Sequence, residues 1–289
     1  MNITFVCTGN TCRSPMAEGL FKKILADRKL TGIECRSCGV YAFPGDEATP
    51  EAIAAAKELG ADISAHRSSP LNQYIIDSTD IFICMTASHA ASLKFFAPKS
   101  DIRILGKGIP DPYGYSAEVY RQCAKAIYEN LMILADVLSV KILPLDEKSV
   151  KGVAEIEKEC FSAPWNEENI RAELDNDTAH FLIAASGEKI IGYIGVHEVA
   201  GEAYIANIAV SEKYRRQGIA EKLLTEAENG AKMRKNEFIS LEVRKSNAAA
   251  ISLYTKRGYK KAGERKNFYT NPAEDAEIMT LTFDKDENE

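Results

Sequence analysis

The chain reads Cys7-Thr8-Gly9-Asn10-Thr11-Cys12-Arg13-Ser14-Pro15 directly after a short apolar run that begins at Asn2. The apolar run predicts a strand, and the residues from Pro15 to about Arg28 carry one apolar helical face. Backbone N–H groups of a loop between a strand and a helix can point inward, and the helix N-terminus adds positive potential. The stretch therefore predicts a strand–loop–helix unit with an anion site sized for phosphate.

Four side chains of this loop suggest covalent chemistry. Cys7 would sit beneath the phosphorus, and Arg13 would bind two phosphate oxygens. Only a few per cent of a free thiol is ionised at pH 7, so a nucleophilic cysteine needs donors that stabilise the thiolate. We expect Ser14 to cap the helix and also to donate to the thiolate, and Asn10 to hold the loop in a left-handed conformation.

A thiolate nucleophile also needs an acid that protonates the leaving group. The loop Asp111-Pro112-Tyr113-Gly114-Tyr115 precedes a predicted helix over 116–138. An isolated Asp-Pro turn is normally a capping device. Beside the cysteine loop, Asp111 is instead a candidate to protonate the leaving group and then to activate water.

The rest of the first half alternates strands with helices. Thr49 is a predicted N-cap, with Pro50 at the first helical position and Gly60 just past the end. Further strands are predicted over 80–85 and 102–105. This alternation predicts an α/β fold with a doubly wound parallel sheet, whose functional groups lie at the carboxyl ends of the strands.

Residues 1 to about 139 resemble the low-molecular-weight protein-tyrosine phosphatase family in the cysteine loop, the Asp-Pro-Tyr triplet and the order of elements. The resemblance implies Cys7 as nucleophile, Arg13 as phosphate binder and Asp111 as acid. It also implies that Ser37 and His66, unremarkable as isolated polar residues, hydrogen-bond with Asn10 beneath the loop. The remaining phosphate-binding positions that it implies are Thr8, Gly9, Asn10, Thr11, Cys12 and Ser14.

Thr11 bears on the substrate. The sequence from Cys7 to Glu18 resembles the bacterial protein-arginine phosphatase branch, in which this threonine helps to orient water and to fit the guanidinium. A hydroxyl suits a polar N–H leaving group better than an aromatic ring, so phosphoarginine is favoured and phosphotyrosine is the alternative. Arsenate reductases have a similar loop but relay oxidation through further cysteines. Cys84 is one candidate for such a relay, but its expected companion is missing because residues 85–92 contain no cysteine.

The seven cysteines are an odd number, which favours free thiols in a reducing compartment over a disulfide framework. Cys12 can form a reversible disulfide with Cys7 that protects the nucleophile, or it can be a small buried hydrophobe. The spacing of Cys35 and Cys38 is thioredoxin-like, but we interpret the pair as structural. No metal site is expected.

The pattern changes near Val140, so we expect one domain over 1–140 and a second, mixed α/β domain over 141–289. A hairpin with the turn Ser186-Gly187-Glu188-Lys189 marks the change. The acidic tail 284–289 is expected to fray. Helices are predicted over 149–161 and 167–175, from Gly218 and from Ala248, and strands over 181–185, 190–197, 203–210, 238–243 and to the end at Phe283.

A second loop suggests a cofactor. Tyr214-Arg215-Arg216-Gln217-Gly218-Ile219-Ala220 follows a predicted strand and opens an amphipathic helix. Gly218 and Ala220 are small where the backbone would approach a ligand. The N–H groups of residues 216–220 could cradle a pyrophosphate at the helix start.

Residues 141–283 resemble the GNAT acetyltransferase superfamily and, more closely, bacterial ribosomal-protein-alanine N-acetyltransferases. The resemblance rests on this loop, on the run from Leu241 to Tyr254 and on Asn267-Phe268-Tyr269. It implies acetyl-CoA as cosubstrate, Glu242 as general base, Tyr254 as general acid and a coenzyme contact from Asn247. It assigns the pyrophosphate to Arg215, Arg216, Gln217, Gly218, Ile219 and Ala220.

Composition bounds the remaining possibilities. The 289 residues are 45% hydrophobic and 27% charged, with a formal net charge of -6. These values are typical of a globular protein and give no indication of nucleic-acid binding. No apolar run is long enough for a membrane span and no signal peptide is evident, so we expect a cytoplasmic protein.

The sequence thus predicts a bifunctional enzyme. Its expected partners are a phosphorylated protein and a ribosomal protein with an N-terminal alanine. An α-amine costs about 1 kcal/mol to deprotonate at pH 7, against about 4 to 5 for lysine, which favours an N-terminal acceptor. The competing class is a binding module that keeps one pocket for recognition alone.

Overall fold

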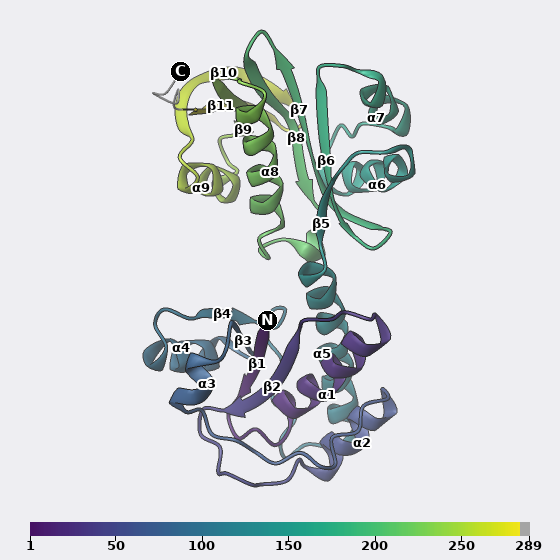
Figure 1. Ribbon diagram of the computed structural model, residues 1–289, viewed down its shortest axis with the longest axis vertical. Coiled ribbons are helices and arrows are strands. Elements are labelled where there is room, and N and C mark those ends of the chain that lie inside the picture. The colour runs from purple at the N-terminus through teal and green to yellow at the C-terminus, as the bar shows by residue number, and fades with distance from the viewer. Residues whose placement is uncertain (284–289) are drawn as a thin grey trace. The chain divides into compact units, whose positions relative to one another are not determined.

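The computed structural model describes Met1 to Phe283, so the acidic tail expected to fray lies outside the described residues. The chain forms two compact units, Met1–Leu138 and Ser139–Glu289. Each unit has its own sheet (Figure 1). The two units are described separately below.

The N-terminal unit is built on a four-stranded sheet in the order β2-β1-β3-β4. Every neighbouring pair is parallel, which confirms the predicted parallel sheet. Its strands are β1 (Asn2–Cys7), β2 (Glu34–Gly39), β3 (Ile81–Cys84) and β4 (Asp101–Ile104).

Helices cover both faces of this sheet, as a doubly wound fold requires. Successive residues of β1 face opposite ways, so Phe5 belongs to one apolar core and Val6 to the other. The first core contains α1 (Arg13–Asp27), α2 (Pro50–Glu58) and α5 (Ala117–Leu138), and the second contains α3 (Gln73–Asp77) and α4 (Ala87–Phe96). Thr49 caps α2 by accepting a hydrogen bond from the backbone N–H of Ala52, as predicted.

The C-terminal unit is a mixed seven-stranded sheet in the order β10-β11-β9-β8-β7-β6-β5. Only the central pair, β8 with β9, is parallel. Its strands are β5 (Lys141–Pro144), β6 (Ala179–Ser186), β7 (Lys189–Val199), β8 (Glu202–Val210), β9 (Phe238–Arg244), β10 (Lys260–Thr270) and β11 (Ala273–Thr282).

The helices of this unit are α6 (Val150–Cys160), α7 (Glu167–Ala172), α8 (Ile219–Met233) and α9 (Ala248–Lys256). The apolar residues of α6 and α7 share a core with β6 and β7. Short 3-10 turns occur at Glu147–Ser149, Glu173–Asp175 and Glu212–Tyr214. Within residues 1–283, none of the helices is long and apolar enough to cross a membrane.

Candidate active sites

The cysteine loop lies between the end of β1 and the start of α1, where a parallel sheet presents its ligands. The Cys7 side chain is buried, with the residue 3% exposed. Its Sγ atom lies 3.0 Å from Ser14 Oγ, and the backbone N–H of Asn10 points at it across 3.3 Å. The Asn10 N–H therefore donates to this sulfur, and the Ser14 hydroxyl lies within hydrogen-bond distance of it, an arrangement that can stabilise a thiolate.

Ser14 does not cap α1, and that expectation is wrong. Cys12 occupies the N-cap position without a side-chain cap, and Ser14 lies one residue inside the helix. The Ser14 hydroxyl is buried and instead lies among Cys7, the Asn10 amide and the Cys38 carbonyl. Its inward position supports the second half of the expectation, a hydrogen bond to the thiolate.

Asn10 adopts the left-handed conformation, with a φ of 55°. Its amide nitrogen donates to Ser14 Oγ and to Ser37 Oγ, both at 2.9 Å. Its side-chain oxygen accepts from the Ser69 N–H at 2.8 Å, and its backbone carbonyl lies 2.8 Å from His66 Nε2. The contacts of Ser37 and His66 with Asn10 are those that the family resemblance implies, and together they fix a strained residue beneath the loop.

Arg13 and Asp111 meet although they lie far apart in the sequence. Arg13 Nη2 donates to Asp111 Oδ2 at 2.6 Å, and Arg13 Nη1 donates to the Ile109 carbonyl at 3.2 Å. The Arg13 side chain is 6% exposed and that of Asp111 is 52% exposed. The arginine is thus held inside the site while the acid stays accessible to a substrate.

These groups line a cleft of about 490 Å³. Aromatic rings of Tyr41, Phe43 and Tyr113 form part of its wall and are largely exposed. The lining also includes Thr8, Gly9, Thr11, Cys12, Asp46, Glu47 and Thr49. A phosphorylated side chain entering the cleft would meet Cys7, Arg13 and Asp111 together.

The other cysteines are free thiols in the structure. Cys12 is a free, buried thiol near the hydroxyls of Thr49 and Tyr120. Cys35 and Cys38 contribute to different apolar cores, so they do not form a thioredoxin-like pair. Burial raises the pKa of Cys84 to about 12, which suits a core residue better than a redox relay.

His89 is a residue of this site that the sequence analysis missed. Its Nε2 lies 2.9 Å from the hydroxyl of Thr8, the residue after Cys7, and its Nδ1 lies 2.9 Å from Thr86 Oγ1. Burial, with a contribution from nearby Arg13, lowers the pKa of His89 to about 4, so the ring is neutral at pH 7. His89 therefore supports the loop through hydrogen bonds rather than through charge.

In the C-terminal unit, the central parallel strands separate. Pairing between β8 and β9 ends at Ile205 with Leu241, although both strands continue. A register shift against β7 leaves Ala206 as an extra residue in β8, and a bulge of this kind bends its strand. The separation exposes backbone of both strands next to Glu242, on the side where the predicted cofactor loop begins.

The predicted cofactor loop, residues 215–220, leads into α8. Gly218 is the N-cap with a φ of 80°, and a Cβ atom there would meet no described atom within 4 Å. Glycine is therefore required by the backbone conformation, and the space beside it stays open. Arg216 also has a positive φ of 63°, and the Arg215 guanidinium folds back to the Val210 carbonyl at 3.0 Å. Arg215 would thus contribute its backbone rather than its charge.

The other loop positions are at the helix start. Gln217 precedes the cap, while Ile219 and Ala220 belong to the first turn, whose N–H groups have no partner inside the helix. Asn247 caps α9, with its side-chain oxygen accepting from the Ala250 N–H at 3.2 Å. A coenzyme contact from Asn247 would therefore use its amide nitrogen.

The side chains of Glu242 and Tyr254 are both buried, and Tyr269 is a neighbour of both. The Tyr269 hydroxyl donates to the Glu242 carbonyl at 3.3 Å. Burial raises the pKa of Tyr254 well above its usual value, and nearby Tyr269 adds to the effect, so the Tyr254 phenol is protonated at neutral pH. Burial also raises the pKa of Glu242, whereas the Arg265 guanidinium lowers it.

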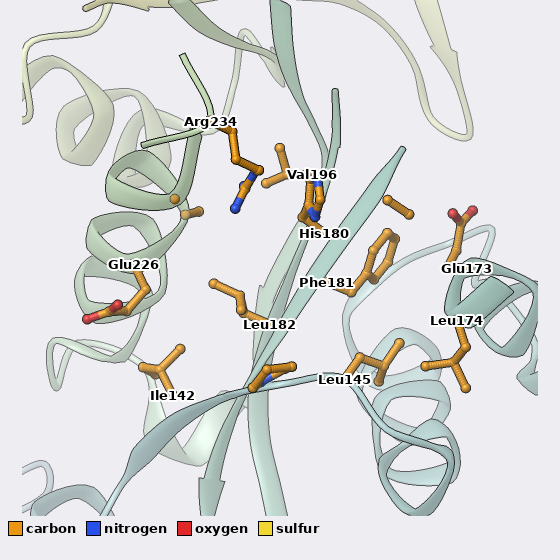
Figure 2. A pocket seen from close by; sticks show the side chains of 14 residues that line it. Ile142, Leu145, Glu173, Leu174, His180, Phe181, Leu182, Val196, Glu226 and Arg234 are labelled. Atoms are coloured by element: carbon orange, nitrogen blue, oxygen red, sulfur yellow. The ribbon is translucent and has the colours of Figure 1, made fainter. Parts of the chain in front are cut away.

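A second cleft, of about 450 Å³, lies elsewhere in the C-terminal unit. Figure 2 shows it between α8, which carries Glu226 and is followed directly by Arg234, and the turn that carries Glu173 and Leu174. Leu182 of β6 and Ile142 of β5 also line it. None of the residues that the sequence analysis assigns to catalysis or cofactor binding belongs to its lining.

With these two sites described, the class of the protein follows from comparison with known families. Residues 2–143 match the family model "Low molecular weight phosphotyrosine protein phosphatase", and residues 150–259 match "Acetyltransferase (GNAT) family". The chain belongs to both families, one in each half, and joins a phosphatase to an acetyltransferase. GNAT acetyltransferases use acetyl-CoA.

Individual relatives cover one half each. The N-terminal half is similar to a protein-arginine-phosphatase of Bacillus subtilis, with 40% identity over 144 residues, 47% of this chain and 95% of that protein. The C-terminal half is similar to the [ribosomal protein bS18]-alanine N-acetyltransferase of Escherichia coli, with 34% identity over 142 residues, 48% of this chain and 95% of that protein. The crystal structure of an Escherichia coli ribosomal-protein-alanine N-acetyltransferase has 31% identity and a TM-score of 0.48, covering 52% of this chain and 98% of that one.

Proposed function

We propose that the phosphatase domain, residues 1–140, removes phosphate from phosphoarginine in proteins. The observation that carries the proposal is the cleft in which buried Cys7 accepts from the Asn10 N–H beside Ser14, with Arg13 and Asp111 on its wall. Each group needed to bind, attack and protonate is present in one cleft.

The Cys7 thiolate attacks phosphorus and forms a P–S bond, while the P–N bond to the guanidine breaks. Asp111 donates its proton to the leaving nitrogen, and Arg13 binds the phosphate oxygens throughout. Asp111, now a carboxylate, takes a proton from water, whose oxygen attacks phosphorus and breaks the P–S bond. Phosphate leaves and the Cys7 thiolate is restored.

Phosphotyrosine is the alternative substrate. The exposed rings of Tyr41, Phe43 and Tyr113 around the cleft would suit an aromatic side chain. Thr11 favours phosphoarginine, because its hydroxyl is a partner for a polar leaving group. The names of the protein-arginine-phosphatase relatives support the same choice.

Thr11→Ile should shift preference from phosphoarginine towards phosphotyrosine. The change removes a hydroxyl from the cleft and adds apolar surface. The kcat/KM for the phosphoarginine peptide divided by that for the phosphotyrosine peptide should therefore fall by about tenfold, which is the effect of about one lost hydrogen bond. Thr11→Ser is the matched control because it keeps the hydroxyl and should keep the preference. An unchanged ratio in Thr11→Ile would show that Thr11 does not set selectivity.

We further propose that residues 141–289 transfer the acetyl group of acetyl-CoA to the N-terminal α-amine of a ribosomal protein that begins with alanine. Glu242 accepts the proton of the amine as the N–C bond forms. Tyr254 protonates the coenzyme A thiolate as the C–S bond breaks. Because the proposed substrates are a ribosomal protein and a protein that carries phosphoarginine, we propose that the enzyme acts in the cytoplasm.

The geometry of three segments supports this proposal. The separated ends of β8 and β9 offer room for a pantetheine chain to lie along exposed backbone. The first turn of α8 and the loop before it offer N–H groups to the pyrophosphate. The amide nitrogen of Asn247 adds a further donor next to β9.

A binding module would keep both pockets without turnover. Hydrolysis of p-nitrophenyl phosphate tests the first domain, and titration with acetyl-CoA followed by acetylation of an alanine peptide tests the second. Binding without turnover in either domain would favour the module. A mixed pool of phosphoarginine and phosphotyrosine peptides then decides between the two phosphatase substrates.

A further inference from the structure

The Glu242 carboxylate is buried, and only one of its two oxygens has a partner. The side chain is 3% exposed, and its Oε1 lies 3.2 Å from Arg265 Nε. Its Oε2 is also buried and has no hydrogen-bond partner within residues 1–283. A buried carboxylate oxygen without a donor is costly, so this oxygen is left for a group that arrives with the substrate.

The sheet register brings Arg265 to this carboxylate. Arg265 of β10 pairs with Ala276 of β11, which pairs with Arg244 of β9, so the three residues lie on one face. Glu242 is two residues before Arg244 and shares that face. Because Ala276 is small, the Arg265 side chain can reach over β11 to Glu242, although the arginine itself is 57% exposed.

The other charged groups near Glu242 have different partners. Arg244 bonds to Glu274 at 3.2 Å and stacks on the Tyr269 ring, with 4.1 Å from its guanidinium carbon to the ring centroid. Tyr269 bonds to the Glu242 backbone, and Tyr254 of α9 is a neutral phenol. Arg265 is therefore the cation that the structure places against the carboxylate.

We propose that Arg265 is a positioning residue for acetyl transfer: it holds one oxygen of Glu242 and keeps the carboxylate charged, so that the other oxygen accepts the proton of the α-amine. The inference rests on the proposed role of Glu242 as base. It adds a residue that acts through Glu242 without contacting the substrate.

The expected consequence is a pH-dependent loss. Burial raises the pKa of Glu242, whereas the Arg265 guanidinium lowers it. Removing the guanidinium should therefore raise the pKa of Glu242 further. A smaller fraction of Glu242 is then ionised on the acid side, whereas the carboxylate is still fully ionised near pH 9. Without the Arg265 guanidinium, the rate of acetylation should therefore be reduced at low pH and close to the wild-type rate at high pH.

The test compares full-length wild type with Arg265→Gln at saturating acetyl-CoA, using a peptide that begins with alanine. The ratio of kcat/KM at pH 9 to kcat/KM at pH 6 should rise by about tenfold in Arg265→Gln. Arg265→Lys should recover most of the low-pH rate. Lys266→Gln is the matched control, because it removes the same charge from the next residue of β10, near Asp275, and should leave the ratio unchanged.

A second measurement does not depend on the peptide. In protein labelled with carboxyl-¹³C glutamate, the Glu242 signal is assigned by its loss in Glu242→Gln, and its titration is followed by NMR. The midpoint should move up in Arg265→Gln and stay in place in Lys266→Gln. An equal loss of activity at every pH, or an unmoved midpoint, overturns the role of Arg265. An inactive wild type with a shifted midpoint instead overturns the proposed acceptor and leaves the role of Arg265 standing.

Discussion

Cys7→Ser should abolish phosphatase turnover while acetyl transfer by the same chain continues. The serine hydroxyl stays protonated at neutral pH, and the donors around position 7 stabilise an anion that serine does not form there. The Asn10 N–H and Ser14 Oγ would remain in place around the smaller atom, so binding of phosphate should survive. The expected loss in kcat is at least about a thousandfold, as for other nucleophiles that act within a catalytic unit.

Turnover of p-nitrophenyl phosphate and of a phosphoarginine peptide measures this effect, retained phosphate binding controls for folding of the phosphatase domain, and acetylation in the same preparation controls for the second domain. Asp111→Asn is the companion variant, since it keeps size and removes the acid. It should slow the phosphoarginine peptide more than p-nitrophenyl phosphate, whose leaving group needs little protonation. Normal turnover by Cys7→Ser would exclude the covalent mechanism.

Much of the geometry of the candidate phosphatase site was predictable because its residues are close together in sequence. Cys7 and Arg13 belong to one short loop, and the strand before it and the helix after it were evident from apolar periodicity. Asn10 was expected to be left-handed because few residues other than glycine tolerate that conformation. Ser14 was misplaced because a serine near a helix start usually caps it, whereas here its hydroxyl turns towards Cys7 and Asn10.

His89 was missed for a physical reason. It lies on α4, a helix whose apolar pattern is too weak to predict, and its partner Thr8 is 81 residues away in sequence. The signal that could have found it is Thr86, a cap residue three positions earlier. The short edge strand β2 was missed too, because Glu34 and Arg36 break its apolar character; Arg36 is satisfied by the hydroxyls of Ser78 and Thr79.

In the acetyltransferase half, most helices and strands were predictable, but the separation of β8 from β9 was not. The strands 203–210 and 238–243 were expected, and the structure has β8 and β9 there. The bulge at Ala206 that opens them has no glycine or proline to signal it. The pairing of Arg265 with Glu242 depends on register across three strands, which periodicity alone does not reveal.

Glu242→Gln should produce the largest loss of acetyl transfer. Glutamine keeps the size and the possible contact to Arg265 but cannot accept the proton of the amine, so kcat/KM at pH 7 should fall by about a hundredfold. The loss should be greatest at low pH, where an α-amine with a pKa of about 7.8 is mostly protonated, and smaller as pH approaches 9. Rates on an alanine peptide across this range measure it, and a uniform loss would contradict the role of base.

Tyr254→Phe should test the proposed general acid independently of the proposed base, Glu242. It removes only a hydroxyl from a buried ring that packs 5.6 Å from the Tyr259 ring, so the fold and the affinity for acetyl-CoA should change little. The departing thiolate loses its proton donor, and kcat should fall by about tenfold or more. Isothermal titration with acetyl-CoA gives the affinity, and peptide acetylation gives kcat. An inert alanine peptide in wild type, together with ready acetylation of lysine side chains, would contradict the energetic argument for an α-amine acceptor. That argument holds that the base deprotonates an α-amine more readily than a lysine amine.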